Sequence, residues 1–187
     1  MQDLENTPPS LRGQLLVAHP TLSDPHFRRA VILLSEHSGE VGAIGVILNR
    51  PLLKTLGTVR ADLADSELTA VPVFEGGPVE PDKVILTAWR WNFGEGTFQL
   101  YFGIAPEMIA ELRAEDPCFE VRAYLGYSGW GGGQLEGELA APAWLVTPLS
   151  EEQMEVERLD SLWRMLIDQW QPELGFLADA PEDPGLN

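Results

Sequence analysis

The chain has 187 residues, of which 44% are hydrophobic and 22% charged, a composition typical of one globular domain with a sizeable core. Its formal net charge of −17 is unevenly divided: up to Pro106 there are 8 basic and 12 acidic residues, and beyond it 4 basic and 17 acidic. Nucleic-acid binding depends on Lys and Arg displacing counterions from phosphates, so this charge argues against direct DNA binding and favours a basic partner, or solubility alone.

The first ten residues lack the basic start and apolar stretch of a signal peptide, and no later segment approaches the roughly 20 apolar residues of a membrane span. We therefore expect a cytoplasmic protein without membrane contact. The single cysteine, Cys118, excludes an intramolecular disulfide and any multi-cysteine metal site. It precedes Phe119 at the start of an expected strand, which favours a buried, inert thiol over a redox sensor.

Short apolar runs bounded by turn residues predict strands in the first half of the chain. Two of them, Ala30–Leu34 and Gly42–Leu48, flank a short polar turn that contains Gly39, which predicts an antiparallel hairpin. Pro51 removes a backbone donor where this ladder is expected to end. The other strands expected along the chain are Gly13–Ala18, Val71–Phe74, Lys83–Trp89, Thr97–Phe102, Phe119–Leu125 and Trp144–Thr147.

Helical spacing of apolar residues predicts the helices. The strongest pattern is the apolar stripe from Leu159 to Trp170, and the spacing of Ser150 and Gln153 indicates a capping box that starts a helical turn at Ser150. The other expected helices are Thr55–Glu67, Pro106–Glu115 and Gln134–Leu139.

Strands outnumber the helices that could cross between them, so we predict an α+β fold with a mainly antiparallel sheet. Residues 1–177 are expected to form a single domain. The segment from 178 to 187 is polar and rich in proline, so we expect a disordered acidic tail there.

The stretch Leu125–Glu136, LGYSGWGGGQLE, carries the densest glycine pattern of the chain. Glycine adopts positive φ cheaply and lets another backbone approach, so we expect a shaped turn between the strand ending at Leu125 and the helix starting at Gln134. Trp130 gives this turn a hydrophobic anchor. The alternative interpretation is a pocket for a ligand or partner, lined by backbone N–H groups and Trp130.

The sequence contains no motif with a complete set of catalytic or metal-binding residues. Ser128 lies in a segment similar to a nucleophile elbow, but Trp130 stands where that motif needs glycine, and His19, His26 and His37 all precede the serine instead of following it. The spacing of these histidines matches no recognised metal site, so we expect neither a metal nor a cofactor. Gly76 and Gly77 are more typical of a structural turn than of a phosphate-binding loop.

Taken together, four segments resemble the YqgE/AlgH family of bacterial proteins, in family order from Gly13 to about Trp170. They are GQLLVAHPTLSDPHFRRAVILLSEH at Gly13–His37, GAIGVILNRPL at Gly42–Leu52, GGPV at Gly76–Val79 and LGYSGWGGGQLEGEL at Leu125–Leu139. The resemblance implies a branched, mainly antiparallel sheet curled into a pseudo-barrel with helices outside. Family members are often labelled as transcriptional regulators, but the resemblance brings no catalytic residues and no DNA-binding motif, and the family commonly has alanine in place of Ser128.

We therefore expect a non-enzymatic binding protein, with a regulatory role through contacts to a protein or small ligand, and a monomer or weak homo-oligomer. The alternative is an enzyme or small-molecule sensor with a pocket beside the Tyr127–Gln134 turn, in which His37, Glu36 or Ser128 supplies polar groups. A direct DNA-binding regulator is the third hypothesis. The expected binding residues are Asn49, Arg50, Gly76, Gly77, Tyr127, Ser128, Gly129, Trp130, Gly131 and Gln134.

Overall fold

The structure is a computed structural model that describes residues 9–92, 94–155, 159–170 and 172–174. It is an α+β fold with one large, mostly antiparallel sheet, as the sequence predicts. The described strands are β1 (Gln14–Ala18), β2 (Val31–Ser38), β3 (Gly42–Ile47), β4 (Pro51–Thr55), β5 (Pro72–Glu75), β6 (Val79–Asn92), β7 (Thr97–Phe102), β8 (Glu120–Gly131) and β9 (Trp144–Pro148). The helical elements are α1 (Leu56–Val59), η1 (Ala61–Leu63), α2 (Pro106–Glu115), α3 (Gln134–Ala140), η2 (Glu151–Met154), α4 (Leu159–Trp170) and η4 (Pro172–Leu174).

The sheet branches at β8. Its main path runs β4-β5-β8-β3-β2-β1-β9, while β6 also pairs with β8 and β7 pairs with β6. The pairing of β5 with β8 is parallel, and the other pairs are antiparallel, including the β2–β3 hairpin. The path has two ends, at β4 and β9, and is not closed into a barrel, so the branched sheet is confirmed and the curled pseudo-barrel is not.

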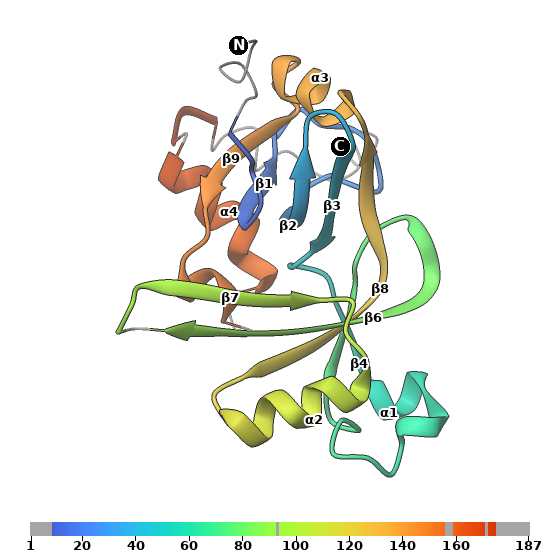
Figure 1. Cartoon of the computed structure of the whole chain (residues 1–187). Helices are drawn as coiled ribbons and strands as arrows, with labels where there is room; N and C mark the ends of the chain where they lie inside the picture. The colour runs from blue at the N-terminus through green and yellow to red at the C-terminus, as the bar shows by residue number, and fades with distance from the viewer. Residues whose placement is uncertain (1–8, 93, 156–158, 171, 175–187) are drawn as a thin grey trace.

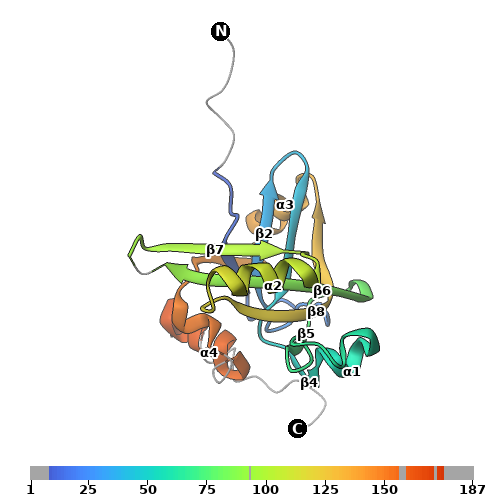
Figure 2. The ribbon, with the colours of Figure 1, turned by 60° about the horizontal axis from the view of Figure 1, so that its bottom comes forward.

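The sheet separates two hydrophobic clusters. Alternate residues of β8 enter different clusters: Tyr124 and Trp130 pack into the first, with β1, β2, β3 and α4, whereas Val121 and Ala123 pack into the second, with α2 and the segment around α1. Figure 1 shows β1, β2 and β3 standing above β6 and β7, with α2 beneath them. In Figure 2 α2 lies across the face of the β6–β8 layer. The middle of β8 is therefore buried on both faces.

Strand β8 contains most of the stretch that the sequence predicts as a turn. The strand does not end at Leu125 but continues to Gly131, changing partners from β5 and β6 to β3 on the way. Gly126 has φ of +68°, and a Cβ built there would lie 2.4 Å from the Gly77 carbonyl oxygen. The turn prediction for Leu125–Glu136 is therefore wrong for most of its length: the glycines allow close backbone approach within a sheet, which sequence alone does not distinguish from a turn.

The helix predicted at Thr55–Glu67 is also wrong. Residues Pro51–Thr55 form the end strand β4, in which Pro51 is the first residue, and two short helical turns follow, interrupted at Arg60 by extended backbone. Leu56, Val59 and Leu63 carry the helical spacing in the sequence, and all three do contact the second cluster, but from two separate turns.

The remaining helices match their predictions closely. Helix α2 spans Pro106–Glu115 and α4 spans Leu159–Trp170 as expected, while α3 runs one residue further than predicted. The capping box at Ser150 is present, and it begins the separate 3-10 turn η2. The tail expected at 178–187 lies outside the described residues. Among the helices of the described ranges, none is long and apolar enough to cross a membrane.

Substitution of Gly126 tests the close approach within β8. We expect Gly126→Ala to lower the free energy of unfolding by roughly 3 kcal/mol or more, because left-handed backbone strain adds to overlap with the Gly77 and Val79 carbonyl oxygens. Gly133→Ala is the matched control: its φ is +74°, yet nothing lies within 4 Å of a Cβ there, so about 1 kcal/mol is expected. Urea denaturation measures both, and equal losses would contradict the close approach.

Candidate functional site

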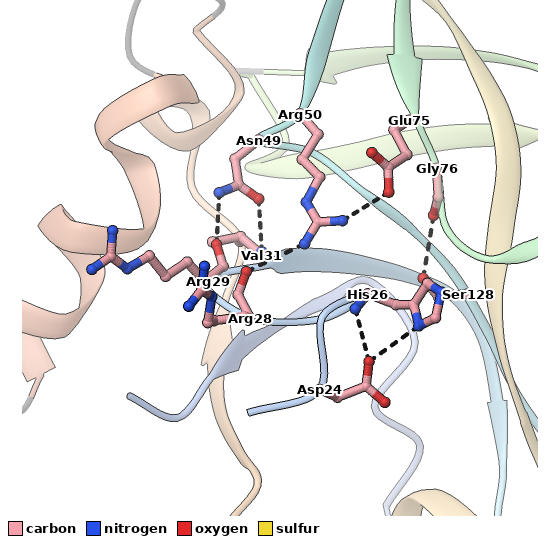
Figure 3. A network of polar contacts seen from close by, with 10 residues as sticks. All are labelled: Asp24, His26, Arg28, Arg29, Val31, Asn49, Arg50, Glu75, Gly76 and Ser128. Carbon is pink, nitrogen blue, oxygen red and sulfur yellow. Dashed lines mark hydrogen bonds and ion pairs between the residues drawn. The ribbon is translucent and has the colours of Figure 1, made fainter. Parts of the chain in front are cut away.

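Asn49 joins the end of β3 to the loop that precedes β2. Its Oδ1 accepts a hydrogen bond from the Val31 N–H at 2.8 Å, and its Nδ2 donates to the Arg29 carbonyl at 2.9 Å (Figure 3). Arg29 has φ of +57°, so this amide holds a loop whose backbone is strained. Both polar ends of Asn49 are thus used within the fold.

Arg50 is likewise directed at its own chain. Its Nη1 donates to Glu75 Oε1 at 2.7 Å and its Nη2 to the Arg28 carbonyl at 3.2 Å, as Figure 3 shows. The Glu75 N–H donates in turn to the Arg50 carbonyl at 3.0 Å. The guanidinium therefore joins the start of β4 to β5 and to the loop before β2.

Ser128 is fully buried, and its hydroxyl donates to the Gly76 carbonyl at 3.2 Å. The same carbonyl accepts the Ile47 N–H at 3.0 Å. A Cβ on Gly77 would lie 2.5 Å from the Ser128 hydroxyl oxygen, so the backbone after β5 lies directly against β8. This hydroxyl has no exposed surface from which it could attack a substrate.

Trp130 is a buried anchor. Its indole stacks on Phe27 with ring centroids 6.0 Å apart, and its Nε1 donates to Glu138 Oε2 at 2.9 Å. The Trp144 indole donates to the same oxygen at 2.8 Å. Gln134 donates to Glu138 Oε1 at 3.0 Å and accepts the Gly131 N–H at 3.1 Å. One carboxylate thus organises the end of β8 and the first turns of α3.

Tyr127 and Gly129 face the opposite side of β8 from Ser128 and Trp130. They line an open depression of about 370 Å³ on the outer face of β2, β3 and β8. The register aligns Glu36, Ile44 and Gly129 across these three strands. We call this surface the outer-face patch; it is lined by Glu36, Val41, Gly42, Ala43, Ile44, Val79, Tyr127, Gly129 and Trp130.

The expected binding residues thus separate into three groups. Asn49, Arg50, Gly76, Gly77 and Ser128 form one connected network of backbone and side-chain contacts. Tyr127 and Gly129 belong to the outer-face patch, and Gly131 and Gln134 belong to the junction with α3. Trp130 lines the patch and also bonds Glu138 of α3. The patch also contains Ile44 and Val79, which the sequence prediction missed because an apolar strand residue gives no sign of which face it occupies, and Val41 in the turn between β2 and β3.

The polar groups of the enzyme alternative are not assembled. His37 is adjacent to Glu36 on β2, so the two side chains lie on opposite faces. His37 Nδ1 accepts the Leu11 N–H at 3.1 Å, and its Nε2 lies 3.1 Å from Glu136 Oε1, so neither ring nitrogen is left for Ser128. In the described ranges, no group of three or more His, Cys, Asp or Glu residues is arranged to hold a metal ion.

Arg122 is a buried charged residue that the sequence prediction did not single out. Its guanidinium lies between the Trp89 and Phe74 rings, 4.7 and 5.2 Å from their centroids, and its Nη2 donates to the Met154 carbonyl. Burial raises the pKa of the neighbouring Tyr124 hydroxyl, and the Arg122 charge opposes that rise. Arg122 therefore attaches η2 to the sheet; an arginine within an alternating strand pattern gives no signal of this.

Cys118 is exposed, so the expectation of a buried thiol is wrong. The residue precedes β8 instead of lying in it, and its N–H donates to Asp116 Oδ1 at 2.9 Å. A hydrogen bond with the Asp116 carboxylate raises the pKa of the thiol. The thiolate that would react with oxidants is thereby disfavoured.

Comparisons with known proteins agree with the resemblance in sequence. A sequence model of the AlgH-like family matches residues 15–175. The UPF0301 protein SCO2948 of Streptomyces coelicolor is 36% identical, over 95% of this chain and 96% of its own. The solution structure of the AlgH protein from Pseudomonas aeruginosa is similar with a TM-score of 0.64 and 26% identity, over 97% of this chain and 98% of that one. The crystal structure of protein DIP2367 from Corynebacterium diphtheriae, at 23% identity and a TM-score of 0.66 over 95% and 94%, supports the fold alone.

Removing the Asn49 amide tests its structural role. We expect Asn49→Ala to lower the free energy of unfolding by about 2 kcal/mol, because the Val31 N–H and the Arg29 carbonyl lose their partners. Arg50→Ala removes a partly exposed ion pair and should cost about 1 kcal/mol or less. Urea denaturation measures both losses. An Asn49→Ala protein as stable as the wild type would contradict the structural role of the Asn49 amide.

The Cys118 thiol should react slowly with iodoacetamide at neutral pH. Because its folded-state pKa is raised, the reaction rate should rise at a higher pH than for the unfolded chain, and Asp116→Asn should shift that rise to lower pH. Mass spectrometry of the alkylated protein across pH gives both curves. A folded-state midpoint at or below that of the chain in urea would rule out the effect of Asp116.

Proposed function

The chain belongs to the AlgH-like family, and from this premise we propose that it is a non-enzymatic binding protein that contacts a protein partner through the outer-face patch. The names of the relatives state no reaction, substrate or partner, so the proposal rests on the chemistry of the site. A regulatory role exercised through such contacts is part of the proposal, and the cytoplasmic location stays a prediction.

The observation that carries the proposal is the apolar character of an exposed sheet face. Val41 is 83% exposed, and Ile44, Val79 and Tyr127 are half-buried around the depression. Gly129 keeps its floor flat because it has no side chain. Exposed apolar patches on soluble proteins are characteristic of contact with other proteins or ligands, and the open form of this one suits a protein surface.

The charge of the patch supports a basic group on the partner. Glu36 lines the depression, and the exposed Glu40 follows it in the hairpin between β2 and β3. Lys83 Nζ lies 6.0 Å from the centroid of the Tyr127 ring, and its charge is paired with Glu80. With a net charge of −17, the whole chain attracts basic proteins and repels nucleic acid. Complementary charge at the rim of an apolar contact increases the association rate and selects the partner.

The enzyme or sensor alternative has less support from the geometry. It requires His37, Glu36 or Ser128 to share a pocket, yet Ser128 is buried against Gly76 and His37 is engaged with Leu11 and Glu136. The expected residues Asn49, Arg50 and Ser128 do not line the patch and make their hydrogen bonds within the fold. Their substitution is expected to affect binding through stability instead of direct contact.

A charge placed on the patch tests the proposal. We expect Val41→Lys to reduce recovery of partner proteins from lysate of the native host by about tenfold, because it introduces a charge into an apolar contact and repels a basic partner. Leu53→Lys is the matched control, since Leu53 is also an exposed aliphatic residue but lies on β4. Quantitative mass spectrometry after affinity capture compares the variants, and equal recovery with Val41→Lys and wild type would reject this surface.

A further inference from the structure

A second apolar surface lies between the end strand β9 and helix α4. Two adjoining depressions of about 190 and 240 Å³ share Thr147 and Trp170. The first is lined by Val17, Leu145, Val146 and Leu166, and the second by Pro148, Leu149, Ser150, Glu152, Gln153, Met165 and Gln169. Trp170, at their junction, is 53% exposed. We call the two depressions together the β9–α4 groove.

Strand β9 lies beside this groove as an end strand of the described sheet. Within the described ranges it pairs with β1 alone and ends the main path of the sheet. The His19 N–H donates to the Ala143 carbonyl, so this pair is hydrogen-bonded. Hydrogen-bonded pairs alternate along an antiparallel ladder, so the backbone N–H and carbonyl groups of Leu145 and Thr147 also point toward β1. The N–H and carbonyl of Val146 then point outward, where another strand could pair.

The opposite end of the sheet is protected, whereas β9 is not. Strand β4 begins with Pro51, has an irregular register before Lys54 and contains Leu53 at φ +53°, all of which hinder the addition of a strand. Strand β9, with the sequence WLVTP, has no charged residue and a regular register with β1, and its proline stands at the end. An edge without these safeguards that lies beside an apolar groove is suited to strand addition.

Charge selects the occupant. Glu152 lines the groove and Glu151, next to it in sequence, is exposed, whereas Asp168 is ion-paired with Arg164. Beyond Pro106 the chain has 4 basic against 17 acidic residues. A second copy would bring the same acidic surface against this one, which is unfavourable. We infer that the β9–α4 groove binds an extended segment of a partner protein that alternates apolar and basic residues, added as a strand to β9.

This site goes beyond the outer-face patch and does not depend on it. The patch lies on the face formed by β2, β3 and β8, whereas the β9–α4 groove lies at the β9 end of the sheet. Failure of one proposal therefore leaves the other standing, because the two use different strands and different variants.

The test uses the full chain and a short fluorescein-labelled synthetic peptide of alternating valine and lysine, with fluorescence anisotropy as the readout. The expected result is saturable binding that weakens with added salt, and much weaker binding of the same peptide with glutamate in place of lysine. Methylating the peptide nitrogens on one edge should abolish binding, and methylating those on the other edge should not, because only one edge can pair with β9.

Two variants locate the peptide. Trp170→Ala should weaken binding about tenfold, while Met108→Ala, which removes a 44% exposed side chain on α2, should leave it unchanged. Val146→Pro removes the outward N–H and should weaken binding similarly, because edge strands accept proline where no ladder bond is lost. If Val146→Pro does not fold, Trp170→Ala and the methylated peptides still decide the question.

Several results would overturn the inference. Binding of the lysine peptide that does not saturate would do so, as would equal affinity for the lysine and glutamate peptides. The same holds if methylation of neither edge weakens binding, or if Trp170→Ala binds the peptide with wild-type affinity. Sedimentation of the chain alone supplies a further result: a dimer that Val146→Pro dissociates would make a second copy the occupant and would overturn the choice of a basic partner.

Discussion

The fold depends on a close approach of two backbones, at Gly76, Gly77 and Gly126. A Cβ on Gly76 would lie 2.2 Å from the Gly126 carbonyl oxygen, and one on Gly77 would lie 2.4 Å from the Tyr127 carbonyl carbon. Side chains at these positions would separate the connection after β5 from strand β8. The hydrogen bond from Ser128 to Gly76 and the parallel pairing of β5 with β8 both require that contact. Strand β8 contributes residues to both hydrophobic clusters, so both clusters depend on this close approach.

This constraint determines which groups remain for binding. Asn49 uses its amide to hold β2 and the loop before it, Arg50 and Ser128 use their polar groups on β5 and the residue that follows it, and Trp130 is held by Glu138. The polar and glycine residues of the family pattern therefore stabilise the sheet. The two surfaces that we propose for partners, the outer-face patch and the β9–α4 groove, are apolar and lie beside this support. Each is lined by one glutamate, which is the basis for proposing a basic partner.

The sequence predicts those elements whose periodicity is set by one buried face. Helices α2 and α4 are of this kind, and their predictions are confirmed. The β2–β3 hairpin is also confirmed, from two apolar runs that flank a short polar turn. Prediction failed where contacts distant in sequence decide the local structure. Gly126 lies in a strand against the Gly77 backbone, and Arg122 is buried between the Trp89 and Phe74 rings, contacts that local sequence does not show. The outer-face patch could not be predicted for the same reason: the alternation of Glu36 and His37 indicates two faces but not which one a helix covers.

The most direct test of this account is native-state hydrogen exchange along β8. If the glycine-rich segment is a strand shared by both halves of the sheet, the amides of Tyr127 to Trp130 that pair with β3 and β6 should exchange only with global unfolding. They should then show the same opening free energy as amides in β1 and β2. Exchange much faster than in those strands would mean that the segment is a mobile binding loop, and would contradict the account.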